Sequence, residues 1–257
     1  MIRCIDTRLV GSSRSRAWQE YLGEPMNRTM QSQYSVLVEF LGKSLGPDYE
    51  VVLHDLGDKS NSIVAIANGH ISGRTIGAPL TNKSLEMMAE HQYESIDYQL
   101  NYSSLSGEEK TLRSSSLVIK NAKGKPVALL CINFNDARYA DIASGIMKLC
   151  HPDAFVVRNT ASPATSIPKD ELASAERFPK SIAAVTESVV GEVVARNGVP
   201  VDRLTQDEKM QIVDTLNHKG VFLLKGAVGL VAESLKSSEA SIYRYLSKLN
   251  RVRESVG

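Results

Sequence analysis

Cysteine is scarce in this sequence, and its placement argues against cross-links and against a metal site. The three cysteines are Cys4, Cys131 and Cys150, with no C-x-x-C pair and no histidine at the spacing of zinc ligands. A scattered, odd count excludes a disulfide framework, and no metal ligand set is expected. Free thiols of this kind are typical of a reducing compartment, so we expect a cytoplasmic protein.

Long hydrophobic runs and an excess of charge of one sign are also missing. No apolar stretch approaches the roughly 20 residues that span a bilayer, so no membrane partner is expected. The 30 basic and 29 acidic side chains leave a net charge of +1, which by itself indicates neither nucleic-acid nor membrane binding. A binding surface must therefore come from a local concentration of charge.

The chain has the length and the apolar content of two domains. Its 257 residues are 42% hydrophobic and 23% charged, which is enough to build sizeable cores. Residues 1–32 carry arginines and serines but no signal-peptide core, and we expect a disordered lead-in there. An upstream start codon, with Met26 or Met30 near the native start, explains this segment better than a transit peptide.

Residues 33–150 show the element order of a PAS-like domain. The expected elements are a helix at 33–45, strands at 49–56 and 62–68, an irregular loop and a helix at 69–93, strands at 97–105, 111–120 and 126–135, and a helix at 136–150. The segment "NAKG" between the last two strands is a hairpin signal. This order predicts one curved antiparallel sheet with helices on one face and a pocket between them.

A segment rich in Ser, Pro and Ala separates this region from a helical one. Residues 151–180 lack apolar periodicity and are expected to form a linker. Residues 181–257 then predict an all-α domain. Its first helix ends at "NG" before Pro200, and Thr205 and Glu208 have the spacing of a capping box at the start of the second.

The stretch "AVGLVAESLKSSEASIYRYL" at 227–246 has the pattern of a helix-turn-helix. Ala232 and Ile242 are the small residue and the apolar plug that let the second helix cross closely over the first. Between residues 219 and 253 there are seven basic and two acidic side chains, a local charge of +5 that suits DNA phosphates. The predicted DNA-binding residues are Lys225, Lys236, Ser238, Ser241, Tyr243, Arg244 and Lys248. The expected fold class is α+β, a PAS-like antiparallel sheet sensor domain followed by an all-α helix-turn-helix domain.

Two residues argue against DNA recognition. Lys236 occupies the turn where glycine most easily adopts a left-handed conformation, at a cost of about 1 kcal/mol if that geometry is required. Glu239 places an acid on the presumed DNA face, which is tolerable if it accepts from a cytosine amino group or points aside. The rival hypothesis is a PAS-type sensor or dimerisation module whose C-terminal helices dock a protein partner and not DNA.

Candidate ligand-binding residues in the first domain lie in three stretches. His54 and Asp55 are adjacent in a strand, so their side chains face opposite sides of the sheet. The loop "NGHISGRTIGAPLTN" has glycines that let the backbone approach a ligand, and Ser72 and Arg74 there could hold an anionic or polar group. Asn133 shares a strand face with Cys131 and is a candidate hydrogen-bonding residue of the pocket.

No catalytic motif supports an enzyme. The sequence contains no G-x-S-x-G, P-loop, G-x-G-x-x-G or H-E-x-x-H pattern, and Cys131 has the features of a small core residue. We therefore expect no catalytic residues.

Several separated segments, in order, resemble one bacterial family. "EVVLHDL", "NGHISGRTIGAPLT", "SSSLVIKNAKGKPVALLCIN" and "KGVFLLKGAVGLVAESLKSSEASIYRYL" are similar to segments of the YheO-like PAS plus helix-turn-helix transcriptional regulators. The resemblance covers about residues 33–250. It implies a cytoplasmic one-component regulator that senses a small-molecule effector of unknown identity and binds a double-stranded DNA operator, usually as a homodimer.

The resemblance also implies roles for individual residues. Carried over by position, the pocket residues are His54, Asp55, Asn68, Ser72, Gly73, Arg74 and Asn133, and the recognition residues are Ser238, Ser241, Tyr243 and Arg244. No cofactor is expected. The chain has Lys236, Ser237, Glu239 and Arg244 where the family tends to have Gly, Val, Arg and Asn, so the operator sequence of relatives cannot be transferred to it.

Overall fold

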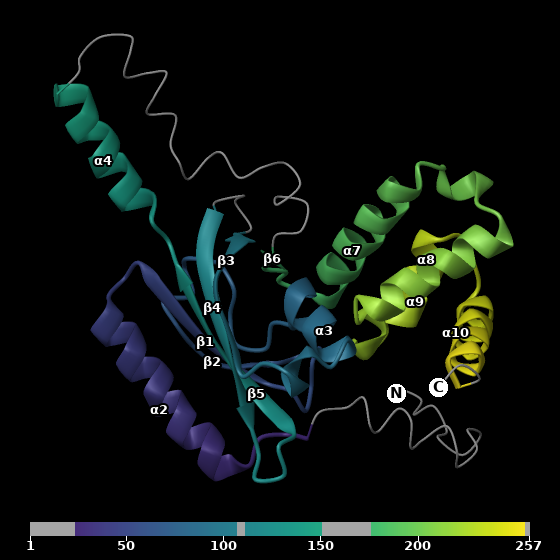
Figure 1. Cartoon of the computed structure of the whole chain (residues 1–257), viewed down its shortest axis with the longest axis horizontal. Helices are drawn as coiled ribbons and strands as arrows, with labels where there is room; N and C mark the ends of the chain where they lie inside the picture. Colours follow the sequence, from purple (N-terminus) through teal and green to yellow (C-terminus); the bar gives the residue numbers. More distant parts are fainter. Residues whose placement is uncertain (1–23, 107–110, 151–175, 255–257) are drawn as a thin grey trace, which may run out of the picture.

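A computed structural model describes residues 24–106, 111–150 and 176–254 of the chain (Figure 1). The expected lead-in up to residue 23 and the expected linker from 151 to 175 lie outside the described residues. Below, the sheet domain means residues 24–150 with 176–180, and the helical domain means residues 181–254. Within the part that the structure describes, no helix is long and apolar enough to cross a membrane.

The sheet domain is built on one curled sheet of six strands in the order β2-β1-β5-β4-β3-β6. The strands are β1 (Tyr49–Asp55), β2 (Ile63–Ala67), β3 (Tyr98–Leu105), β4 (Thr111–Lys120), β5 (Pro126–Phe134) and β6 (Glu176–Arg177). The first five pair antiparallel, which confirms the PAS-like sheet that the sequence predicts. The edge strand β6 pairs parallel with β3, so the whole sheet is mixed.

Helix α2 (Arg28–Leu45) covers one face of the sheet (Figure 1). Alternate residues of β1, Val51 and Leu53, point to this face and pack with Val38 of the helix in one apolar cluster. The helix lies so close to β2 that a Cβ at Gly42 would overlap the Cβ of Ala67. Only glycine at this position permits that approach.

The N-terminal boundary of the sheet domain differs from the sequence expectation. Helix α2 begins at Arg28 and not at residue 33, because the Asn27 side chain accepts a hydrogen bond from Met30 N at 2.9 Å and caps the helix. Met26 is buried in the apolar cluster under α2. Residues 24–32, expected to belong to a disordered lead-in, are therefore an ordered part of the domain.

The opposite face of the sheet is covered by the segment between β2 and β3. This segment contains a loop at residues 68–81, helix α3 (Asn82–Ala89) and the short helix η2 (Gln92–Glu94). Thr81 caps α3 by accepting a hydrogen bond from Ser84 N at 3.1 Å, as expected for a helix beginning near residue 81. Helix α4 (Ala137–Cys150) follows β5 and extends away from the sheet (Figure 1).

The end of the expected linker belongs to the sheet. In β6, Glu176 and Arg177 pair with Ser104 and Leu105 of β3, and Phe178 is buried against Ile71 and Leu112. The linker prediction is therefore wrong for residues 176–178, which return the chain to the sheet domain immediately before the helical domain begins.

The helical domain contains α7 (Ile182–Asn197), α8 (Gln206–His218), α9 (Ala227–Ser234) and α10 (Glu239–Glu254), with short helices η4 (Val201–Arg203) and η5 (Val221–Leu223) between them. The predicted capping box is confirmed, because Thr205 and Glu208 bond each other's backbone N–H groups at the start of α8. Gly198, at a φ of +70°, ends α7 in the left-handed conformation that "NG" predicts.

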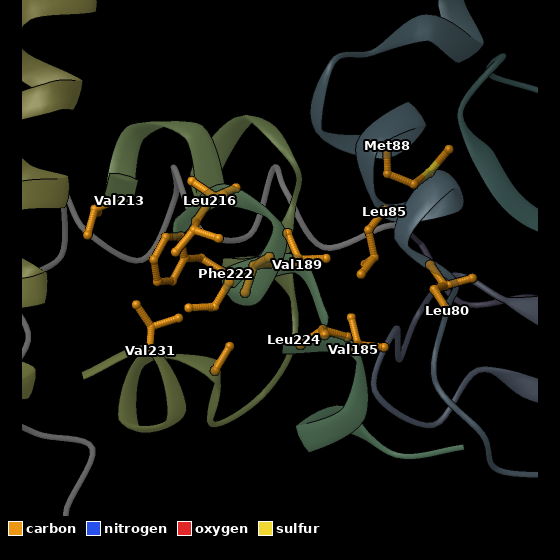
Figure 2. Close-up of a cluster of buried hydrophobic side chains, with 14 of the residues drawn as sticks. Leu80, Leu85, Met88, Val185, Val189, Val213, Leu216, Phe222, Leu224 and Val231 are labelled. Carbon is orange, nitrogen blue, oxygen red and sulfur yellow. The ribbon is translucent and has the colours of Figure 1, made fainter. Parts of the chain in front are cut away.

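One hydrophobic core runs from the sheet domain into the helical domain (Figure 2). Leu85 of α3 lies beside Val185 and Val189 of α7, and Met88 and Phe222 belong to the same cluster. The two domains approach so closely that a Cβ at Gly220 would overlap the carbonyl oxygen of Leu85. The sheet domain and the helical domain are therefore packed together.

Candidate functional site: a helix-turn-helix surface and a buried polar cluster

Helices α9 and α10 form the predicted helix-turn-helix. Ala232 is 4% exposed and Ile242 is fully buried in the same core cluster, as a close crossing of the two helices requires. Lys236 has a φ of +46°, so the turn does take the left-handed conformation there. The turn is closed by hydrogen bonds from Lys236 N to Glu233 O at 3.0 Å and from Ser237 N to Ala232 O at 2.8 Å.

One face of α10 is open to solvent. Tyr243, Arg244 and Lys248 are exposed along it. The exposed Ser238 precedes the helix and caps it by accepting from Ser241 N at 3.2 Å, and the two hydroxyls lie 3.0 Å apart. Hydroxyl, guanidinium and ammonium groups on one helix face are the groups that contact DNA phosphates and base edges.

Two of the predicted DNA-binding lysines are engaged elsewhere. Lys225 Nζ donates to Asp58 Oδ2 of the sheet domain at 2.6 Å. Lys236 forms an ion pair with Asp202 of η4. A lysine that the sequence did not suggest, Lys209 of α8, lies beside the turn and donates to Ser237 Oγ at 3.2 Å.

A row of polar side chains crosses the buried face of the sheet. Glu50 of β1, Asn133 of β5 and Ser114 of β4 are register partners, so their side chains point to the same face. Asn133 Nδ2 donates to Glu50 Oε1 at 2.8 Å, and Asn133 Oδ1 accepts from Ser114 Oγ at 2.7 Å. Ser114 in turn lies 2.5 Å from Ser104 Oγ of β3. Asn133, a predicted pocket residue, is 1% exposed at the centre of this row.

The loop between β2 and α3 closes over this row. Ser72 donates to Glu50 Oε2 through its backbone N at 3.2 Å and through its hydroxyl at 2.6 Å. Gly73 follows at a φ of +71°, and Arg74 is 3% exposed. The loop residues singled out from the sequence are thus brought to the same buried site as Asn133.

Arg74 is a buried cation with incomplete hydrogen bonding. Its Nη2 donates to the carbonyl of Pro79, and its guanidinium lies 5.9 Å from the centre of the Phe178 ring. Among the described residues, Arg74 Nε has no hydrogen-bond partner. Burial lowers the pKa of Arg74, and the nearby Glu176 and Glu50 oppose that shift. A buried N–H group of this kind is costly unless an acceptor reaches it.

The edge strand adds an acid to the same site. Glu176 is 2% exposed and accepts a hydrogen bond from Thr81 Oγ1 at 2.5 Å. Burial raises the pKa of Glu176, and hydrogen bonds from Thr81 and Tyr102 together with the charge of Arg74 partly offset that rise. Tyr102 OH also lies 2.8 Å from Ser116 Oγ, and burial raises the pKa of Tyr102.

Cys131 completes this group of side chains. Its Sγ lies 3.1 Å from Ser116 Oγ, and burial raises the pKa of the thiol to about 12. Such a thiol is protonated at neutral pH and is a poor nucleophile. The buried polar cluster consists of Glu50, Ser72, Arg74, Thr81, Tyr102, Ser104, Ser114, Ser116, Cys131, Asn133 and Glu176.

The other predicted pocket residues have different surroundings. His54 is buried with its Nδ1 2.8 Å from Ser62 Oγ, and burial lowers its pKa well below the ordinary value. Asp55 accepts from Met26 N at 3.2 Å, on the face of the sheet that α2 covers. Asn68 donates to three backbone carbonyls between α2 and β1 and lines a surface groove of about 580 Å³ beside α2. Neither Asp55 nor Asn68 reaches the buried polar cluster.

Two acids of the cluster were missed in the sequence, for different reasons. Glu50 stands four residues before His54 in β1, and strand alternation places both side chains on the same face. That signal was available. Glu176 lies in a segment without apolar periodicity, and only its pairing with β3 brings it to the site.

Comparison with known proteins identifies the family of the chain. Residues 26–151 match the YheO-like PAS domain, and residues 185–247 match a helix-turn-helix domain. The uncharacterized protein YheO of Escherichia coli K12 is 30% identical over 216 residues, which are 83% of this chain and 82% of YheO. An uncharacterized Haemophilus influenzae protein is 27% identical over 87% of this chain and 92% of its own length.

A third relative carries a functional name. The transcriptional regulator DauR of Pseudomonas aeruginosa is 26% identical over 216 residues, which are 84% of this chain and 92% of DauR. A YheO-like PAS domain followed by a helix-turn-helix domain is the architecture of a DNA-binding regulator. The chain belongs to the YheO-like family of PAS and helix-turn-helix transcriptional regulators.

Proposed function

We propose that the protein is a cytoplasmic transcriptional regulator that binds an operator through α10 and responds to a small molecule bound in the sheet domain. The observation that carries this proposal is the solvent-exposed face of α10, with Tyr243, Arg244 and Lys248 on a helix held in helix-turn-helix geometry. No residue is assigned a catalytic role. Operator binding is assigned to a homodimer, since two half-sites require two such helices.

The DNA contacts are assigned by position on α10. Ser238 and Ser241 at its start are placed against the backbone or base edges, because the first turn of a recognition helix enters the major groove. Arg244 is the residue for a bidentate contact to guanine or phosphate. Lys209, beside the turn, adds a contact to the DNA backbone. Lys225 and Lys236, predicted as DNA-binding residues, are assigned no DNA contact here, because acidic partners hold their ammonium groups.

The effector site is assigned to the buried polar cluster. Arg74 Nε lacks an acceptor among the described residues, so an effector that carries an anionic oxygen would satisfy it. Hydroxyl groups of Ser114, Ser116 and Tyr102 would bind further polar groups of the effector. Of the predicted pocket residues, Ser72, Arg74 and Asn133 belong to this site, Gly73 joins Ser72 to Arg74 in the loop, and His54 lies on the same sheet face.

The coupling between effector and DNA is assigned to β6 and α3. Glu176 stands six residues before α7 and bonds to Thr81, the cap of α3. Helix α3 packs against α8 and η5 of the helical domain. An effector that hydrogen-bonds to Glu176 or Thr81 would break the bond between them and would therefore shift the helical domain relative to the sheet domain. Operator affinity would change to the extent that the effector binds the shifted arrangement more tightly than the original one.

The experiment that tests the proposal is selection of genomic DNA fragments by the purified protein, titrated against salt. The expected result is a palindromic site whose binding falls steeply with salt, as several phosphate contacts require. Weak binding without sequence preference at physiological salt would contradict the proposal. It would favour the second candidate function, in which the helical domain docks a protein partner through the same exposed face of α10.

The effector site is tested separately, on the protein already bound to its operator fragment. A panel of small organic anions and matched neutral amides is screened for release or tightening of the DNA. An active anion should lose its effect in Arg74→Gln, which keeps polar N–H groups near this position but removes the charge. An equal effect of the neutral amide would contradict the assignment of Arg74.

A further inference from the structure

Helix α4 is the least buried element of the sheet domain. It has 14 residues from Ala137 to Cys150, and none of them is buried in the described chain. Among the described residues, the side-chain contacts that hold α4 to the sheet lie in its first turn, where Arg138 Nη2 is 3.6 Å from Asp48 Oδ2 and the rings of Tyr139 and Phe134 are 5.5 Å apart. Beyond that turn the helix extends from the sheet, away from the helical domain (Figure 1).

The exposed residues of α4 follow a regular apolar pattern. Tyr139, Ile142, Ile146 and Leu149 are separated by three, four and three residues, and each is more than half exposed. This is the spacing of the a and d positions in a coiled coil, which places all four side chains on one stripe of the helix. Within α4, Asp141 and Lys148 stand away from this stripe, and Ala143 and Gly145 flank it.

A helix of this length is only marginally stable in water by itself. Isolated helices shorter than about 12–15 residues are marginal even with favourable sequences, and their stability in proteins comes from packing of an apolar face. In α4 that face has no partner within the described residues. Soluble monomers also rarely expose contiguous apolar patches of this kind, so something covers the stripe.

We infer that α4 is a dimerisation helix whose apolar stripe packs against α4 of a second copy of the same chain. A straight stripe with three-four-three spacing is self-complementary, because two identical helices related by a twofold axis interlock their a and d side chains. Pairing the two stripes would bury on the order of 1,000 Å² in total, the lower limit for a specific interface. Apart from Arg138 in the first turn, which pairs with Asp48, the residues that flank the stripe carry no charge, as suits the centre of such an interface.

This inference goes beyond the proposed function, because it concerns association of the protein in the absence of DNA. The test is the mass of the full-length protein in solution, measured by light scattering after gel filtration without DNA. Wild type is expected at twice the chain mass of 28.1 kDa. The double variant Ile142→Glu/Ile146→Glu is expected to be a monomer. Its circular dichroism spectrum should differ from that of wild type by no more than the helical signal of α4.

A matched control comes from the opposite side of the helix. Lys148→Glu changes the net charge by the same −2 as the double variant, but Lys148 stands away from the stripe. This control is expected to remain a dimer. A monomeric wild type, a dimeric double variant, or a monomeric control would each overturn the inference.

Cross-linking gives a second and independent readout. In a background with Cys4→Ser and Cys150→Ser, a short bismaleimide should link two copies through Ile142→Cys and should fail to link them through Lys148→Cys. The buried Cys131 remains protected in both proteins. Equal cross-linking at the two positions would contradict an interface formed by the stripe.

Discussion

Lys225, in the turn before α9, donates to Asp58 of the sheet domain, with Nζ 2.6 Å from Oδ2, across 167 residues of sequence. The backbone N of Lys225 also donates to Ser60 Oγ at 2.7 Å. A lysine that the sequence predicts to bind DNA is therefore part of the contact between the domains. Because the pair is exposed to solvent, its ion-pair contribution to stability is small.

This placement predicts different effects for two basic residues on DNA binding. Arg244→Ala should weaken binding to the selected operator by about 1–3 kcal/mol, because the guanidinium is exposed, lies 5.7 Å from the centre of the Tyr245 ring, and can contact a base edge or a phosphate. Lys225→Ala should change it by less than about 1 kcal/mol, since Asp58 already holds the ammonium group. Fluorescence anisotropy with a labelled operator measures both. Equal losses would place Lys225 on the DNA.

The left-handed turn predicts a stabilising glycine. Lys236 has a φ of +46°, a conformation that costs a residue with a Cβ roughly 1–2 kcal/mol. Lys236→Gly and Lys236→Ala both lose the ion pair with Asp202, but only the glycine variant relieves the strain. Lys236→Gly should therefore have a free energy of unfolding about 1 kcal/mol above that of Lys236→Ala in urea denaturation. An alanine variant of equal or greater stability would contradict this account.

The close approach of the domains predicts a large effect at one glycine and a smaller one at its neighbour. Gly220 and Gly226 have φ values of +71° and +79°, so alanine brings a similar backbone strain of about 1–2 kcal/mol at both. At Gly220 the new Cβ also overlaps the Leu85 carbonyl, whereas at Gly226 nothing lies within 4 Å. Gly220→Ala should therefore unfold at the lower temperature and be cut faster by a protease between the domains. Equal melting temperatures would indicate that the interface yields easily.

The buried acid at the edge strand predicts a pH-dependent stability. Burial raises the pKa of Glu176 above its ordinary value of 4.5, so the folded state favours the protonated form. Its contribution to stability is present below about 4.5 and is lost as the pH rises through the pKa in the folded protein. Glu176→Gln cannot ionise. The difference in free energy of unfolding, variant minus wild type, should increase as the pH is raised from 4.5 to 8.

Urea denaturation at several pH values measures this difference. The buried His54 also titrates on unfolding, with stability lost as the pH falls below 6.5, but it is present in both proteins and cancels in the comparison. A difference that stays constant with pH would show that Glu176 is ionised in the folded protein over the whole range.

Several features could be predicted from short stretches of sequence. Ala232 and Ile242 define the helix crossing, Thr205 and Glu208 start α8, and strand alternation orients Asn133, because each signal depends on residues within one or two elements. The sequence also places Lys236 at the turn, but it leaves open whether a left-handed conformation is required there, and the structure shows one at a φ of +46°. Periodicity and capping depend on residues close together in the chain, so they can be recognised from the sequence alone.

The partners of buried polar groups could not be predicted in this way. Glu176 joins Thr81, 95 residues earlier in the chain, only because β6 pairs with β3. Met26 becomes part of a core only because α2 lies over β1. Asp55 and Asn68 resembled pocket residues by position, yet their hydrogen bonds tie α2 and the N-terminal segment to the sheet.

The sequence by itself determined the order of the helices and strands, the helix-turn-helix and the family, since these depend on local periodicity and on motifs in a given order. The tertiary structure alone decided which charges meet, from Arg74 in the buried polar cluster to Lys225 at the domain contact. The physical reason is that sequence spacing predicts ion pairs within one helix, such as Lys43 with Glu39, but not the partners that Arg74 and Lys225 find on other elements. The partner of such a side chain is set by the packing of elements distant in sequence, and burial then determines the strength of the interaction and the shift in pKa.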